Sequence, residues 1–207
     1  TFLEQADRFS LDRKGLRSIL YMSEKKKDQA KEVSSHYDLG NEFYKLWLDP
    51  TMSYSCAYFK HEDDTLEQAQ RNKVDYILEK LYLKEGMTLL DIGCGWGFLL
   101  IEAAKKYGVK GYGCTLSKEQ WKKGQERIKA EGLEGQVQIE LVDYRDLEDK
   151  GLIFDRIVSV GMMEHVGRSN YATYMETANH LLKDGGIFLL HTITGHDEVV
   201  SEPWIRK

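Results

Sequence analysis

Short apolar runs alternate with longer stretches of helical periodicity from residue 65 onward. Apolar runs bounded by turn residues indicate buried strands, whereas apolar positions spaced three and four residues apart indicate one face of a helix. The pattern predicts strands at 89–92, 109–115, 137–142, 154–160 and 187–193. Strands that alternate with helices are typical of a doubly wound, mostly parallel α/β sheet, in which ligands bind beyond the carboxyl ends of the strands.

Polar N-cap residues and glycines predict where the helices begin and end. Thr65 and Ser117 each open a capping box with a glutamine three residues later. Gly108 follows the helix between the first two strands and is a typical C-cap residue. Ser169 is expected to cap a later helix that continues to the run 184–186, directly before the fifth strand.

The composition divides the chain into a helical or linker segment at 1–35, a helical lid and substrate-pocket segment at 36–84, and a ligand-binding α/β core at 85–207. The first segment carries apolar residues at 16–22 beside basic ones, a pattern that suits docking on an anionic membrane surface. A solvated helix face is the alternative, since acidic residues dilute the charge. The second segment is dense in aromatics and hydroxyls, of which Phe43, Trp47 and Phe59 are expected to be ordinary core residues.

The first predicted strand leads into three glycines at alternate positions, Asp91-Ile92-Gly93-Cys94-Gly95-Trp96-Gly97. Glycines let the backbone turn with positive φ and let a ligand approach the main chain, and the N–H groups of the helix that follows favour an anionic group. A dinucleotide-binding fingerprint would place its third glycine where Phe98 stands. The run therefore points to another cofactor, or to a tight turn without a ligand.

Composition and residue spacing argue against several classes of function. The chain has 207 residues, 42% hydrophobic and 30% charged, with a net charge of −5, so nucleic-acid binding is not expected. No apolar run approaches the ~20 residues that span a bilayer, and three cysteines without paired spacing favour a reducing cytosol. His36, His165, His191 and His196 lack metal-ligand spacing, so no metal site is predicted.

Five sequence blocks occur in a fixed order: HYDLGN at 36–41, YSCAYF at 54–59, LDIGCGWG at 90–97, GMMEHVG at 161–167 and LLHTI at 189–193. With these blocks, the chain resembles the cyclopropane-fatty-acyl-phospholipid synthase family, to which the mycolic acid cyclopropane synthases are related. The resemblance covers about residues 36–207. It implies a class I S-adenosylmethionine (SAM) methyltransferase-like sheet whose last strands lie beyond this chain, which would leave the fifth strand as an apolar edge.

The resemblance also implies the chemistry. The family transfers a methylene carbon from SAM to the cis double bond of a lipid acyl chain, and bound bicarbonate removes the surplus proton so that the ring closes. Glu164, His191, Cys56 and the main chain at Ile193 match the positions that hold bicarbonate. Taken alone, Glu164 could be a loop carboxylate and His191 a core histidine, and Cys56 is interpreted as a supporting thiol rather than a nucleophile.

The residues that match cofactor contacts are Tyr54, Ser55, Asp91, Gly93, Gly95, Gly97, Thr115, Leu116, Gln120, Asp143, Tyr144 and Arg145. For the run 143–146, a solvated turn is the alternative. The expected partners are unsaturated phospholipid acyl chains at the cytoplasmic face of the inner membrane, and a homodimer is left open. The competing hypotheses are a SAM-dependent methyltransferase that closes no ring, and a SAM-binding or membrane-associating module without activity.

Overall fold

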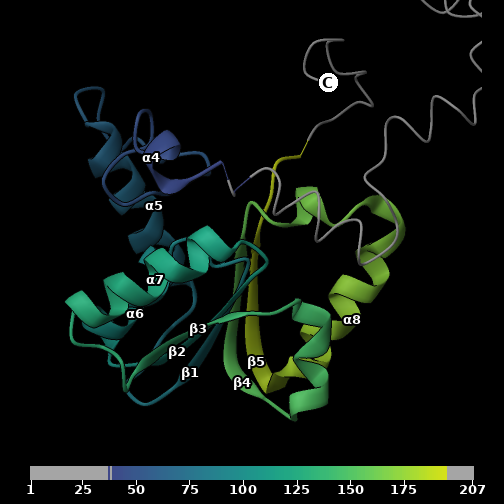
Figure 1. Ribbon diagram of the computed structural model, residues 1–207. Coiled ribbons are helices and arrows are strands. Elements are labelled where there is room, and N and C mark those ends of the chain that lie inside the picture. Colours follow the sequence, from purple (N-terminus) through teal and green to yellow (C-terminus); the bar gives the residue numbers. More distant parts are fainter. Residues whose placement is uncertain (1–36, 38, 195–207) are drawn as a thin grey trace, which may run out of the picture.

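A parallel five-stranded sheet in the order β3-β2-β1-β4-β5 forms the centre of the computed structural model, which describes residue 37 and residues 39–194 (Figure 1). The strands are β1 (Thr88–Ile92), β2 (Lys110–Thr115), β3 (Val137–Leu141), β4 (Phe154–Val160) and β5 (Leu182–His191). Every strand pair is parallel, so the predicted α/β class is confirmed. The basic patch at 16–22, His36 and His196 lie outside the described residues.

Helices cover both faces of the sheet. The α-helices are α4 (Asn41–Tyr44), α5 (Leu66–Lys80), α6 (Phe98–Tyr107), α7 (Lys118–Ala130) and α8 (Tyr171–Leu181), and the 3₁₀ turns are η1 (Tyr144–Asp146), η2 (Glu148–Lys150), η3 (Met163–His165) and η4 (Arg168–Asn170). Successive residues of a strand point to opposite faces. Leu89 accordingly packs in one apolar cluster with α5, α6 and α7, while Leu90 packs in a second cluster with α8 and η1.

Two of the predicted helix starts are confirmed. The Thr65 hydroxyl accepts a hydrogen bond from the backbone N–H of Gln68 at 3.2 Å, and the Ser117 hydroxyl accepts one from the N–H of Gln120, also at 3.2 Å. These bonds satisfy N–H groups that have no partner within a helix. Gly108 adopts the left-handed conformation at the end of α6, as its C-cap pattern predicts.

The prediction for the last helix is wrong at both ends. Ser169 lies in η4, and α8 follows Asn170, whose side chain makes no capping bond. The helix ends at Leu181 rather than at 184–186, because Leu182 already pairs with Phe154 of β4 and so begins β5. The register shifts before the next pair, and residues 183–186 form an irregular start to the strand.

The lid segment differs from its prediction in which aromatics are buried. Phe43, Trp47 and Phe59 are 45%, 44% and 53% exposed, so their assignment to the core is wrong. Tyr44 is the buried aromatic of α4 and packs with Trp96 of the glycine turn. A helix of one turn presents only one side to the core, and its flanking residues therefore remain at the surface.

Polar side chains fix the lid segment to the core. The Gln70 amide donates to the carbonyls of Ser53 and Ser55 at 3.2 and 2.9 Å. The Arg127 guanidinium donates to the carbonyl of Thr51 at 2.9 Å, and the Trp96 indole N–H donates to Asn41 at 2.6 Å. Within the described residues, no helix is both long and apolar enough to cross a membrane.

Candidate active site

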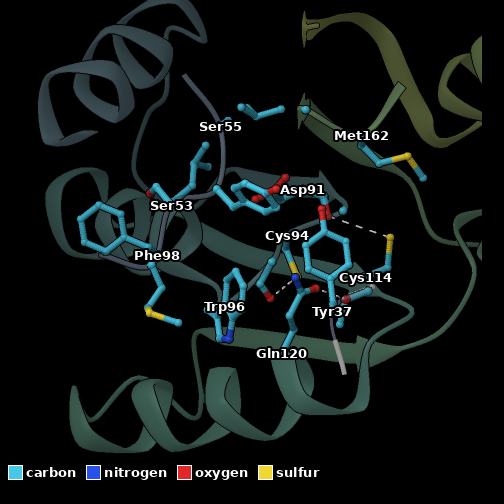
Figure 2. A pocket seen from close by; sticks show the side chains of 18 of the residues that line it. Tyr37, Ser53, Ser55, Asp91, Cys94, Trp96, Phe98, Cys114, Gln120 and Met162 are labelled. Atoms are coloured by element: carbon cyan, nitrogen blue, oxygen red, sulfur yellow. Dashed lines mark hydrogen bonds between the residues drawn. The ribbon is translucent and has the colours of Figure 1, made fainter. Parts of the chain in front are cut away.

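A cavity lies beyond the carboxyl ends of β1, β2 and β4, where the order of the strands reverses (Figure 2). Open α/β sheets bind ligands at this switch point. The empty space inside the cavity and at its mouth, where it opens to solvent, is about 1000 Å³. The predicted cofactor residues in its lining are Tyr54, Ser55, Asp91, Gly93, Gly95, Thr115, Leu116, Gln120 and Tyr144.

The three glycines of the turn have different surroundings, although all have positive φ, at 80°, 54° and 81°. A Cβ atom built on Gly95 would meet no atom within 4 Å, so this residue faces open space in the cavity wall. A Cβ on Gly93 would lie 2.6 Å from Met162. A Cβ on Gly97 would lie 2.6 Å from Ile139, and Gly97 is absent from the lining. Gly95 is thus where a ligand can approach the main chain, whereas Gly97 allows packing.

The side of the cavity nearest β2 carries a fixed polar pair. The Thr115 hydroxyl donates to Gln120 Oε1 at 2.7 Å and accepts from the backbone N–H of Ser117 at 3.2 Å. Both Thr115 and Gln120 are buried, and Leu116 lies between them in the lining. The pair therefore offers preoriented hydrogen-bonding groups, which suits the ribose hydroxyls of a nucleoside.

The turn after β3 divides its three predicted cofactor residues. Tyr144 lines the cavity, and burial raises the pKa of its phenol to about 12, so the hydroxyl stays protonated at neutral pH. Asp143 and Arg145 form an ion pair at 2.7 Å and are not in the lining. Their predicted contact with adenine stays a prediction.

A buried lysine and a buried aspartate both line the cavity. Lys73 of α5 donates to the Ser55 hydroxyl at 2.6 Å. Burial lowers the pKa of Lys73 to about 8 and raises the pKa of Asp91 to about 7. The Asp91 carboxylate is 3% exposed and has no hydrogen-bond partner among the described residues.

The four residues matched to bicarbonate form two contacts. Glu164 Oε1 accepts a hydrogen bond from the backbone N–H of Ile193 at 2.7 Å. Cys56 Sγ lies 3.6 Å from His191 Nε2. None of the four lines the main cavity, but two of them are next to lining residues in the sequence. Cys56 follows Ser55, and Glu164 precedes His165 in η3.

Each of these two contacts, Glu164–Ile193 and Cys56–His191, includes a side chain with an unpartnered polar atom that a small ligand could bind. Glu164 Oε2 and His191 Nδ1 are buried without a hydrogen-bond partner in the described part of the chain. A buried polar atom without a partner is costly, so such atoms usually await a ligand or water. The residues fit a small oxyanion with a proton to donate, and the open wall at Gly95 fits a larger cofactor.

Several lining residues were not identified from the sequence. Tyr37 bonds to His165 at 3.4 Å, and both line the cavity together with Trp96 and Lys73. For Lys73 a signal existed, because it stands four residues before Ile77 and so falls on the buried face of α5. Across the described ranges, no group of three His, Cys, Asp or Glu side chains could hold a metal ion.

Two curated relatives each match most of the chain. The cyclopropane-fatty-acyl-phospholipid synthase of Escherichia coli strain K12 is 54% identical over 173 residues, which is 83% of this chain and 43% of that protein. A protein of Pseudomonas putida named probable fatty acid methyltransferase is 51% identical over 172 residues, again 83% of this chain and 43% of that protein. The chain thus spans less than half the length of these relatives.

A solved structure, mycolic acid cyclopropane synthase CmaA1 complexed with SAH and CTAB, has a TM-score of 0.75 and 44% identity, and the match covers 80% of this chain and 57% of that one. It shares the fold described here. The family model described as mycolic acid cyclopropane synthetase matches residues 24–207. Since this match extends over most of the sequence and agrees with the fold and with both relatives, the chain belongs to the mycolic acid cyclopropane synthetase family.

Proposed function

We propose that this chain carries the SAM site and the proton-removing site of an enzyme that converts the cis double bond of an unsaturated phospholipid acyl chain into a cyclopropane. The observation that carries the proposal is the pair of contacts Glu164–Ile193 and Cys56–His191, which leave two buried polar atoms unpartnered beside the cavity. A simple methyltransferase needs the cavity but not this second cluster.

The second cluster matters because the overall reaction must release a proton. The alkene carbon forms a bond to the carbon leaving the sulfonium, and one C–H bond of that carbon must then break as the ring closes. Bicarbonate, when bound, supplies the base for this proton. Glu164, His191, Cys56 and the Ile193 N–H would hold it.

An apolar surface beside the cavity supports a lipid substrate. Leu46 is 81% exposed, and Phe43 and Trp47 are half-exposed on the same short segment. The Trp47 ring lies 5.0 Å from that of Tyr54, which lines the cavity. We infer that this surface, residues 43–47, meets a phospholipid bilayer at the cytoplasmic face of the membrane, where exposed apolar side chains would gain by burial in the acyl boundary.

The test is to incubate the full-length protein with SAM and vesicles of unsaturated phospholipid and to analyse the acyl chains. Ring closure and simple C-methylation both add one CH₂ to the acyl mass, so mass alone does not separate them. We expect the alkene to be lost, so that the modified acyl chains resist oxidative cleavage. Bound SAM without any change in the lipid would overturn the proposal in favour of an inactive binding module.

The alternative is methylation of the alkene without ring closure, which the name of the Pseudomonas putida relative favours. It predicts a product of the same mass that still contains a double bond. The bilayer contact has its own test. Leu46→Glu is expected to reduce co-sedimentation with the vesicles, and Leu66→Glu, at another exposed leucine, is its control. Equal sedimentation of both variants and the unaltered protein would refute the contact.

A further inference from the structure

We propose that Lys73 binds the α-carboxylate of SAM and thereby recognises the amino-acid end of the cofactor. The inference rests on the proposed use of SAM but not on the fate of the lipid. Lys73 lies in the interior of α5, is 6% exposed and lines the cavity. A lysine in such a place is unusual, since lysines are almost never fully buried unless they are paired.

The surroundings of Lys73 give its ammonium group no ion-pair partner in the described part of the chain. Its ammonium group has three donors, and the single hydrogen bond it makes among the described residues goes to the neutral hydroxyl of Ser55. None of the carboxylates in the described ranges lies within ion-pair distance of it. Burying an unpaired charge is costly, so an anionic group in the cavity would restore a partner to the ammonium.

The position of Lys73 favours the cofactor carboxylate over bicarbonate as this anion. Lys73 shares the cavity lining with Gly93, Gly95 and Ser55, whereas Glu164 and His191 are outside that lining. The same wall also carries the unpartnered carboxylate of Asp91. A cation and an anion facing one cavity complement a zwitterion, and the methionine end of SAM carries both an α-carboxylate and an α-ammonium group.

Electrostatics around Lys73 agree with this assignment. Burial lowers its pKa to about 8, against the opposing effects of Cys56, Asp49 and Asp91. Burial likewise raises the pKa of Asp91 to about 7. Both groups are thus held near the point of losing their charge, and a bound zwitterion would favour the charged form of each.

The experiment compares two ligands that differ only at the amino-acid end. S-adenosylhomocysteine keeps that end, and 5′-methylthioadenosine lacks it. Binding of each to the full-length protein is measured by calorimetry for the unaltered protein, Lys73→Met, Lys73→Arg and the control Lys80→Met, which removes an exposed charge from the same helix. Lys73→Met preserves the length of the side chain, so the fold is expected to remain.

Lys73→Met is expected to weaken S-adenosylhomocysteine about 10- to 100-fold, the effect of losing a hydrogen bond to a charged group, and to leave 5′-methylthioadenosine unchanged. Lys73→Arg should recover part of the loss, and Lys80→Met should bind like the unaltered protein. Equal weakening of both ligands would show a structural role and overturn the inference, as would no weakening of either. Unaltered protein that binds S-adenosylhomocysteine but forms no cyclopropane would refute the proposed function and leave this inference standing.

Discussion

Replacing Glu164 by glutamine changes one atom of the proposed proton-removing site. In the structure, Glu164 Oε1 accepts from the Ile193 N–H at 2.7 Å, and a glutamine carbonyl can keep this bond. The buried and unpartnered Oε2 becomes an NH₂ group, so an acceptor is lost and a donor is gained. A hydrogen bond to a charged group is worth about 1.5–3 kcal/mol, so we expect turnover to fall about 10- to 150-fold at each bicarbonate concentration below saturation.

The assay measures cyclopropane formation by the full-length protein against bicarbonate concentration, at saturating SAM. Glu164→Gln should raise the bicarbonate requirement and leave SAM affinity unchanged, because Glu164 does not line the cofactor cavity. Glu176→Gln, on the exposed side of α8, is the matched control and should behave like the unaltered protein. Unchanged turnover in bicarbonate-depleted buffer, or a loss fully explained by weaker SAM binding, would refute the reasoning.

Three further outcomes are expected. Gly95→Val should abolish SAM binding because its side chain would enter the open wall, whereas Gly132→Val, also at positive φ, should cost only stability; calorimetry checks both. Affinity for S-adenosylhomocysteine should fall above about pH 8 as Lys73 loses its proton and below about pH 7 as Asp91 gains one, and Lys73→Arg should remove the fall on the alkaline side. Arg127→Met, which loses the bond to Thr51, should lower the free energy of unfolding by about 1.5–3 kcal/mol in denaturant titration.

Local patterns predicted the elements whose formation depends on local chemistry. The N-cap bonds at Thr65 and Ser117 need only residues three positions apart, and both form. The reciprocal half of each predicted capping box is not seen, since the Gln68 side chain bonds to Asn72 and the Gln120 side chain to Thr115. The glycine turn likewise follows from residues that tolerate positive φ. The order of the strands could be anticipated only as a class, because alternating strands and helices permit few parallel arrangements.

The features that the sequence did not predict correctly all depend on residues far away in the chain. Ser169 has the chemistry of a cap, but the pairing of Leu182 with Phe154 and the 3₁₀ turn η4 set the limits of α8. Phe43 and Trp47 look like core residues until the single turn of α4 is placed at the surface. The role proposed for Lys73 could not be predicted from the sequence, because it depends on the contact with Ser55 of the lid segment.

The two proposed sites share their backbone. Ser55 lines the cofactor cavity, and the next residue, Cys56, contacts His191. In the same way Met162 lines the cavity, and Glu164, two residues later, bonds to Ile193. A cofactor that settles against the lid and the turn after β4 therefore also fixes the residues of the second cluster. Because the two sets of residues share this backbone, a displacement of either segment is expected to affect cofactor binding and proton removal together.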